Sequence, residues 1–174
     1  MIFTLPPLIY NRIDTILDVF DRANGDATYG YFKTKQRGFA PINDDLLHPS
    51  QFPWMFLEFG NTTAPAYPVT NNMEYDFILN LVAMTVADKG KIGDLVVSES
   101  LNVNKGILDI LKDVGAVLGA HKVGGLGIAG VIDWHWGSTR PMANMMYMTP
   151  QNLSPYIRII QIDLIFQCRE RIVP

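Results

Sequence analysis

The sequence predicts an α+β fold: a mixed, largely antiparallel sheet with two main helices packed on one face, plus extended loops or a β-hairpin arm. Three observations lead to this class. Segments 7–21 and 99–119 carry apolar residues at helical spacing, four other segments are strand-like, and the two kinds follow one another as helix, strands, helix, strands. A chain of 174 residues is expected to form one domain, 1–174.

Both predicted helices are amphipathic. The first has an apolar face made of Ile9, Ile13, Ile16, Leu17 and Phe20, and a polar face made of Asn11, Arg12, Asp14 and Asp18. The second has an apolar stripe made of Val103, Ile107, Leu108, Leu111, Val114 and Leu118, with Ser100 or Asn102 as its N-cap. Each helix is therefore expected to pack one face on a core.

The strand-like segments are 54–59, 74–86, 127–136 and 156–168. The second is nearly apolar on both faces toward its end, so we expect it to be central. Its alternation predicts one face with Tyr75, Phe77, Leu79 and Leu81, and another with Asp76 and Asn80. The chain between these elements is expected to form a strand pair or extended arm at 24–53 and loops at 61–72 and 137–155.

Three glycines, Gly125, Gly127 and Gly130, have the spacing of a dinucleotide-binding fingerprint. That fingerprint requires a strand before the glycines and a helix after them. Here a predicted helix precedes them and a predicted strand follows, and no acidic residue lies about 20 residues further on to hold a ribose. The glycines are therefore expected to end the helix and form a turn, and no cofactor is predicted.

The segment DWHWGS contains Asp133, His135 and Ser138, the residue types of a hydrolytic triad. On a strand, Asp133 and His135 would be about 7 Å apart, and the serine lacks a nucleophile elbow. We expect Ile132, Trp134 and Trp136 to share the opposite face and to pack. The histidines and the single cysteine lie in separate segments, so no metal site is predicted.

The charge pattern disfavours direct nucleic-acid binding. The formal net charge is -3, and from position 38 to 88 there is no Lys or Arg. Acidic residues in that stretch, among them Asp44, Asp45 and Glu74, should repel a polyanion. The lone Cys168 is typical of a reducing compartment. No apolar run approaches the ~20 residues that span a bilayer, so no membrane is expected.

The segment 141–155 is rich in methionine and has no charge between Arg140 and Arg158. An apolar loop of this kind should be covered, either by its own domain or by another protein. We favour the second possibility and predict an oligomer or partner interface made of Met142, Met145, Met146, Tyr147 and Met148.

The order of elements resembles that of bacteriophage tail terminator proteins, within the wider group of minor tail and neck proteins of long-tailed phages. The segments that carry the resemblance are LIYNRIDTILDVF, FPWMFLEF, EYDFILNLVAMTV, NKGILDILKDVGAVL and YIRIIQIDLIFQC. They cover most of the chain. Segment 22–50 and the methionine-rich segment have no counterpart in this resemblance.

The resemblance implies a structural virion protein that is not an enzyme. It would form a homo-oligomeric ring, usually a homohexamer, that caps the tail tube and joins the tail to the neck. Partners would be other copies of the chain, the tail tube protein, neck or connector proteins and the tail sheath. DNA would only pass through the channel, past acidic residues such as Asp44, Asp45 and Glu74. Assembly would take place in the bacterial host cytoplasm. The alternatives are a head-completion or connector protein, another tail subunit, or a small enzyme or ligand-binding domain.

Overall fold

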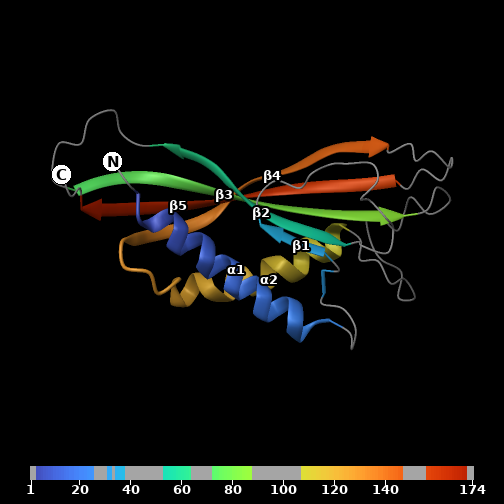
Figure 1. The fold of residues 1–174 in the computed structure, drawn as a ribbon, viewed down its shortest axis with the longest axis horizontal. Helices are drawn as coiled ribbons and strands as arrows, with labels where there is room; N and C mark the ends of the chain where they lie inside the picture. Colours follow the sequence, from blue (N-terminus) through green and yellow to red (C-terminus); the bar gives the residue numbers. More distant parts are fainter. Residues whose placement is uncertain are drawn as a thin grey trace.

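The computed structural model describes residues 3–25, 31–32, 34–37, 53–63, 72–87, 107–146 and 156–171. Their elements are α1 (Leu5–Ala23), β1 (Thr34–Arg37), β2 (Trp54–Thr63), β3 (Asn72–Ala87), α2 (Ile107–Gly124), β4 (Val131–Met146) and β5 (Tyr156–Arg171). Figure 1 shows the strands as one sheet, with both helices on the same side of it. The predicted α+β class is confirmed.

The sheet is mixed and largely antiparallel, as predicted. Its strand order is β1-β2-β3-β5-β4. Only β1 and β2 pair in parallel, while β3 pairs antiparallel with β2 and β5, and β4 pairs antiparallel with β5. The predicted central strand is therefore confirmed in β3, which has a neighbour on each side.

The core lies between the helices and one face of the sheet, which we call the helix face. On β3 it consists of Met73, Tyr75, Phe77, Leu79, Leu81 and Ala83, all at most 4% exposed. The opposing helix residues are buried as well and include Ile9, Ile13 and Leu17 of α1 and Ile110, Val114 and Leu118 of α2. The predicted stripes are confirmed at these positions, except that Ile110 was not among the predicted residues.

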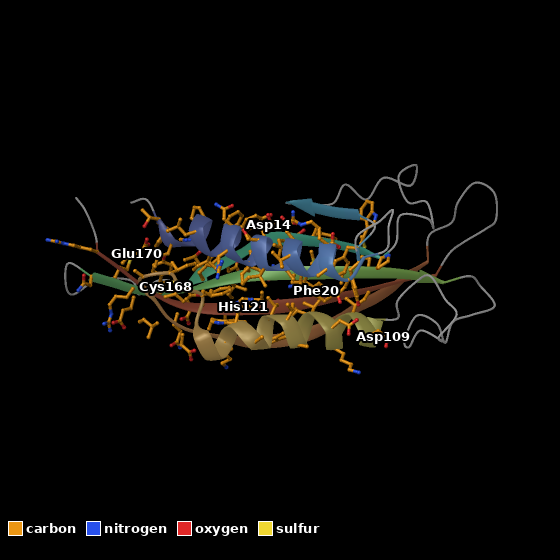
Figure 2. The ribbon with its side chains drawn as sticks, turned by 90° about the horizontal axis from the view of Figure 1, so that it is seen from below. Asp14, Phe20, Asp109, His121, Cys168 and Glu170 are labelled. Carbon is orange, nitrogen blue, oxygen red and sulfur yellow. The ribbon has the colours of Figure 1, made fainter. Side chains whose placement is uncertain are left out.

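The beginning of α1 is capped by a residue from the last strand. Oε1 of Glu170 accepts hydrogen bonds from the amides of Thr4 and Leu5, each 2.8 Å long, and Oε2 accepts one of 2.7 Å from the Tyr75 hydroxyl. A carboxylate is favourable there because helix N-terminal amides lack partners and carry partial positive charge. Figure 2 shows Glu170 and Cys168 near the end of β5, beside the beginning of α1.

One predicted polar residue of α1 is buried. Asp14, which the sequence placed on the polar face, is only 2% exposed. It lies on the same side of the helix as Tyr10, Ile13 and Leu17, which are buried too. Positions three and four apart on a helix lie side by side, so the buried face is wider than the apolar residues alone indicate.

The largest difference from the sequence prediction concerns 137–155. The prediction of a loop is wrong for 137–146, because β4 continues to Met146 and pairs with β5 along its length. The prolines and asparagines suggested a loop. However, β4 lies at one edge of the sheet. An edge strand tolerates Pro141 because one side of its backbone needs no ladder hydrogen bonds.

A bulge in β4 corrects a second expectation. Ile132 was expected to pack on the same face as Trp134 and Trp136, but it is 55% exposed, whereas Trp134 is 2% exposed. The register with β5 shifts between Val131 and Asp133, so Ile132 is the additional residue. A bulge breaks the alternation of side chains, and this is why the simple two-residue period fails here.

The second face of the sheet, which we call the outer face, has two different halves. In the half near the start of β2, Trp54, Phe56, Val82 and Met84 are buried. In the other half, Glu74, Asp76, Asp133, Gln167 and Arg169 are exposed. β3 contributes to both halves, with Val82 and Met84 in the buried one and Glu74 and Asp76 in the exposed one, so the difference does not come from the pleat. The exposed half is the part available for contacts.

Candidate functional site

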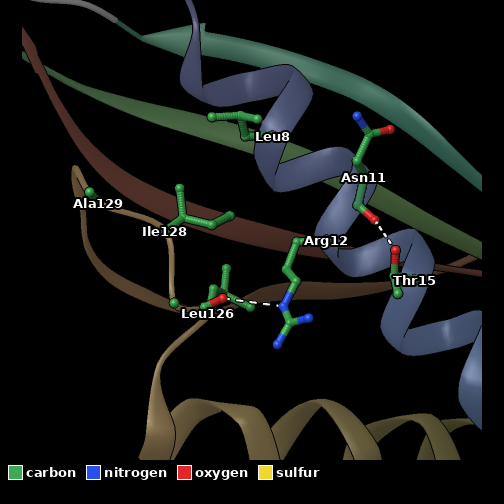
Figure 3. A pocket seen from close by; sticks show the side chains of 8 residues that line it. Leu8, Asn11, Arg12, Thr15, Leu126, Ile128 and Ala129 are labelled. Carbon is green, nitrogen blue, oxygen red and sulfur yellow. Dashed lines mark hydrogen bonds between the residues drawn. The ribbon is translucent and has the colours of Figure 1, made fainter.

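An open groove lies on the helix side of the molecule, between α1 and the turn that joins α2 to β4 (Figure 3). Its volume is about 680 Å³. Its lining residues are Leu8, Asn11, Arg12, Thr15, Leu126, Gly127, Ile128 and Ala129. Leu8, one of the apolar lining residues, is 52% exposed. The groove therefore combines apolar side chains with one cation.

Arg12 is the charged residue of this groove. Its Nε donates a hydrogen bond of 3.2 Å to the carbonyl oxygen of Leu126, which joins α1 to the turn (Figure 3). No carboxylate pairs with Arg12 among the described residues. A guanidinium has five N–H donors in a planar fork, so Arg12 retains donors for a carboxylate from outside the chain.

The turn itself answers the question raised by the three glycines. Gly125, Gly127 and Gly130 have φ values of 68°, 70° and 96°, a region that residues with a side chain rarely adopt. A helix precedes them and a strand follows, as predicted, which is the reverse of the dinucleotide fingerprint. At Gly130 an added Cβ would lie 2.8 Å from the Arg169 carbonyl oxygen. The glycines form the turn that shapes one wall of the groove.

The exposed half of the outer face carries an acidic patch, which we define as Asp76 and Asp133 with the neighbouring Ile78, Ile165 and Gln167. Gln167 pairs with Asp76 on β3 and with Asp133 on β4, so the three residues form a row across the sheet. Asp133 accepts a hydrogen bond of 2.8 Å from the Trp134 amide. In the described structure neither carboxylate is paired with a cation.

The row between the two halves of the outer face is polar but more buried. It contains Glu58, Asn80 and Asp163 in register on three neighbouring strands. Gln161 donates a hydrogen bond of 2.8 Å to Asp163, and burial raises the pKa of Glu58. The row marks the place where the outer face changes from buried to exposed.

The structure describes only part of the residues predicted as site residues. Met142, Met145 and Met146 lie on β4, where they pair with Ile159, Ile157 and Tyr156, but the structure does not describe their side chains. Tyr147, Met148, Asp44 and Asp45 lie outside the described residues. Glu74 is exposed on the outer face and accepts a 2.8 Å hydrogen bond from Arg169. Its role in lining a channel stays a prediction.

The described residues contain neither a cluster of metal ligands nor a membrane-spanning helix. No three His, Cys, Asp or Glu side chains in this part of the chain lie close enough together to hold a metal ion. Neither of the two described helices is long and apolar enough to cross a membrane. The comparisons with known proteins found no matching family model and no curated protein with a significant match.

The sequence analysis missed both the groove and the acidic patch. The groove had a signal, because Leu8 and Val19 are apolar residues on the otherwise polar side of the first helix, in line with Arg12 and Thr15. The acidic patch had a weaker signal in the sequence. The alternation in β3 places Asp76 on the outer face, whereas the neighbourhood of Asp133 depends on the bulge and on the pairing of strands.

Proposed function

We propose that the protein is a structural virion protein of the tail terminator type, which forms a homo-oligomeric ring that caps the tail tube and joins the tail to the neck. The arrangement of elements carries the proposal. The opening helix, the aromatic strand after Pro53, the long central strand, the second helix and the closing strand are the segments that resemble this family. They pack around a single core as α1, β2, β3, α2 and β5.

The surface of the described residues supports self-assembly. Leu8, Val19 and Ile132 are each more than half exposed, and apolar exposure of this kind often marks sites that another protein covers. Isolated exposed apolar residues are common, but two of these three lie beside a charge, Leu8 beside Arg12 and Ile132 beside Asp133. Such mixed patches are typical of interfaces that form after folding.

The proposed partners follow from this assignment. One side of the ring would contact the tail tube, the other the neck or connector, and the sheath where the tail has one. The segment from Met142 to Met148 is our candidate for one of these contacts. DNA would pass through the channel without specific binding. The ring would be assembled in the host cytoplasm and would become part of the virion tail.

Electron microscopy of purified tail tubes mixed with the protein tests this proposal. We expect a ring at one end of each tube and an end to further tube growth. Isolated head connectors serve as the parallel target, because binding to connectors without binding to tubes would favour a head-completion or connector protein. A protein that binds neither target and stays monomeric would contradict a ring-forming role.

A small-ligand-binding domain is the second candidate function, and the groove beside Arg12 is the observation that favours it. Its volume of about 680 Å³ is in the range of small-molecule sites. The reversed order of helix and strand argues against a nucleotide. We therefore expect no rise in the midpoint of thermal unfolding with NAD, and a clear rise would revive the ligand-binding reading.

A further inference from the structure

We propose that the groove beside Arg12 in one copy of the chain binds the acidic patch of Asp76 and Asp133 in the next copy, in a head-to-tail contact. This inference rests on the proposed function and specifies how the ring would close. The two surfaces were derived from separate observations. One belongs to α1 and the turn after α2, and the other belongs to the outer face of the sheet.

The first argument is charge complementarity. Arg12 uses Nε for the carbonyl oxygen of Leu126 and has no carboxylate partner among the described residues. Asp76 and Asp133 are exposed acids without a cation in that same part of the chain. By contrast, Glu74 and Arg169 in the neighbouring row already pair with each other. Arg12, Asp76 and Asp133 therefore keep their charges available for a partner outside the chain.

The second argument is that both surfaces place apolar side chains next to the charge. Leu8 and Ile128 lie beside Arg12 in the groove (Figure 3). Ile132 projects from the bulge next to Asp133, and Ile78 and Ile165 are half-buried beside the acidic row. An interface with an apolar centre and paired charges gains affinity from burial and orientation from the ion pair.

The third argument concerns symmetry. The groove is on the helix side of the sheet and the patch is on the outer face, so the two surfaces point away from the molecule on opposite sides. A contact between unlike surfaces is heterologous, and heterologous contacts repeat from copy to copy and form a ring where the rotation between copies closes. The edge of the sheet is a poorer route, because β4 has three register shifts and Pro141 on that edge.

Charge reversal followed by charge exchange tests the contact. We expect Arg12→Glu and Asp133→Arg each to weaken self-association at least roughly tenfold, because each places like charges in contact. The double variant with both substitutions should recover most of the association. Arg22→Glu is the matched control, since Arg22 is also exposed on α1 and bonds only to the carbonyl of its own helix residue Asp18.

Light scattering over a concentration series measures the mass of each variant, and circular dichroism verifies that it is folded. The contact would be supported if the wild type forms rings, the two single reversals weaken their assembly, and the double variant restores it. Rings of unchanged affinity in both single variants would overturn the contact and leave the ring itself standing. A wild type that reaches only a dimer would contradict the head-to-tail geometry. A wild type that is monomeric alone and on tail tubes would contradict the contact and the proposed function together.

Discussion

The two faces of the sheet show how one set of strands serves two purposes. On β3, the residues of the helix face are all at most 4% exposed, whereas Glu74 and Asp76 between them are exposed. Neighbouring residues on the strand therefore belong to different faces and have different roles. The helix face holds the core, and the exposed half of the outer face is open to contacts, so we propose that assembly uses that half.

The largest difference should appear between two isoleucines of β5. Ile162 is fully buried on the helix face, and Ile165 is half-buried on the outer face. Ile162→Ala should lower the free energy of unfolding by roughly 2–5 kcal/mol, because it leaves a cavity between sheet and helices. Ile165→Ala should cost clearly less. Chemical denaturation measures both, and equal losses would show that the two faces are packed alike.

The turn after α2 gives the next effect. Gly130→Ala should cost about 1–3 kcal/mol, since φ is 96° and the new Cβ would lie 2.8 Å from the Arg169 carbonyl and 3.0 Å from Leu5. Gly119→Ala is the control: it is helical, has nothing within 4 Å of the added Cβ, and should raise stability by roughly 0.5–1 kcal/mol. If Gly130→Ala is as stable as the wild type, the turn is not a rigid wall between helix and sheet.

Two glutamates at one end of the sheet provide a smaller comparison. Glu170 caps α1 from the helix face, and Glu74 pairs with Arg169 on the outer face. Glu170→Gln should cost about 1–2 kcal/mol at neutral pH, because four donors lose a charged acceptor. Glu74→Gln should cost about 0.2–1 kcal/mol, as for an exposed ion pair. A larger loss in Glu74→Gln would contradict the assignment of the two faces.

Glu170 should also make stability depend on pH. Burial raises its pKa, but the hydrogen bonds from Thr4, Tyr75 and the amides of Thr4 and Leu5 outweigh burial and hold the pKa below its usual value. Its contribution is then present above the pKa of the unfolded chain, near 4.5, and is lost as the pH falls through the lower folded value. Glu170→Gln should lack this part of the acid sensitivity in denaturation curves recorded at several pH values.

The smallest effect is one of reactivity. Cys168 is 1% exposed on the helix face, and burial raises the pKa of its thiol to about 12. The thiolate is the reactive form, so a thiol reagent should label the native protein very slowly. Gln167→Cys places a second thiol on the exposed outer face of the same strand, and in the unassembled chain this one should react quickly. Rapid labelling of both thiols would show that the helix layer opens readily.

Much of the fold could be predicted from the sequence because its main signals are periodic. The stripe of Ile9, Ile13 and Leu17 and the alternation of Tyr75 and Phe77 depend only on local geometry and burial. The errors lie where long-range structure decides. The length of β4 depends on its edge position, the exposure of Ile132 depends on a bulge, and the burial of Asp14 depends on what covers α1.

The candidate site was harder to predict than the fold. The acidic patch joins Asp76 and Asp133, which are far apart in the sequence and meet only through their common neighbour Gln167. The groove needs the glycine turn to approach α1 at Arg12. Composition and spacing therefore indicated an uncharged interface near the methionines, whereas the described structure offers charged and apolar surfaces elsewhere.

Cysteine cross-linking between copies tests the central claim most directly, which is that the groove of one copy meets the outer face of the next. Arg12→Cys and Asp133→Cys are made in separate chains, and Cys168 stays protected by burial. Mixing the two chains under mild oxidation should give a disulfide-linked dimer that neither chain forms alone. A chain with both substitutions should give a ladder that ends at the ring size. The account would be contradicted if the protein still forms rings while neither the mixture nor the double variant gives cross-links.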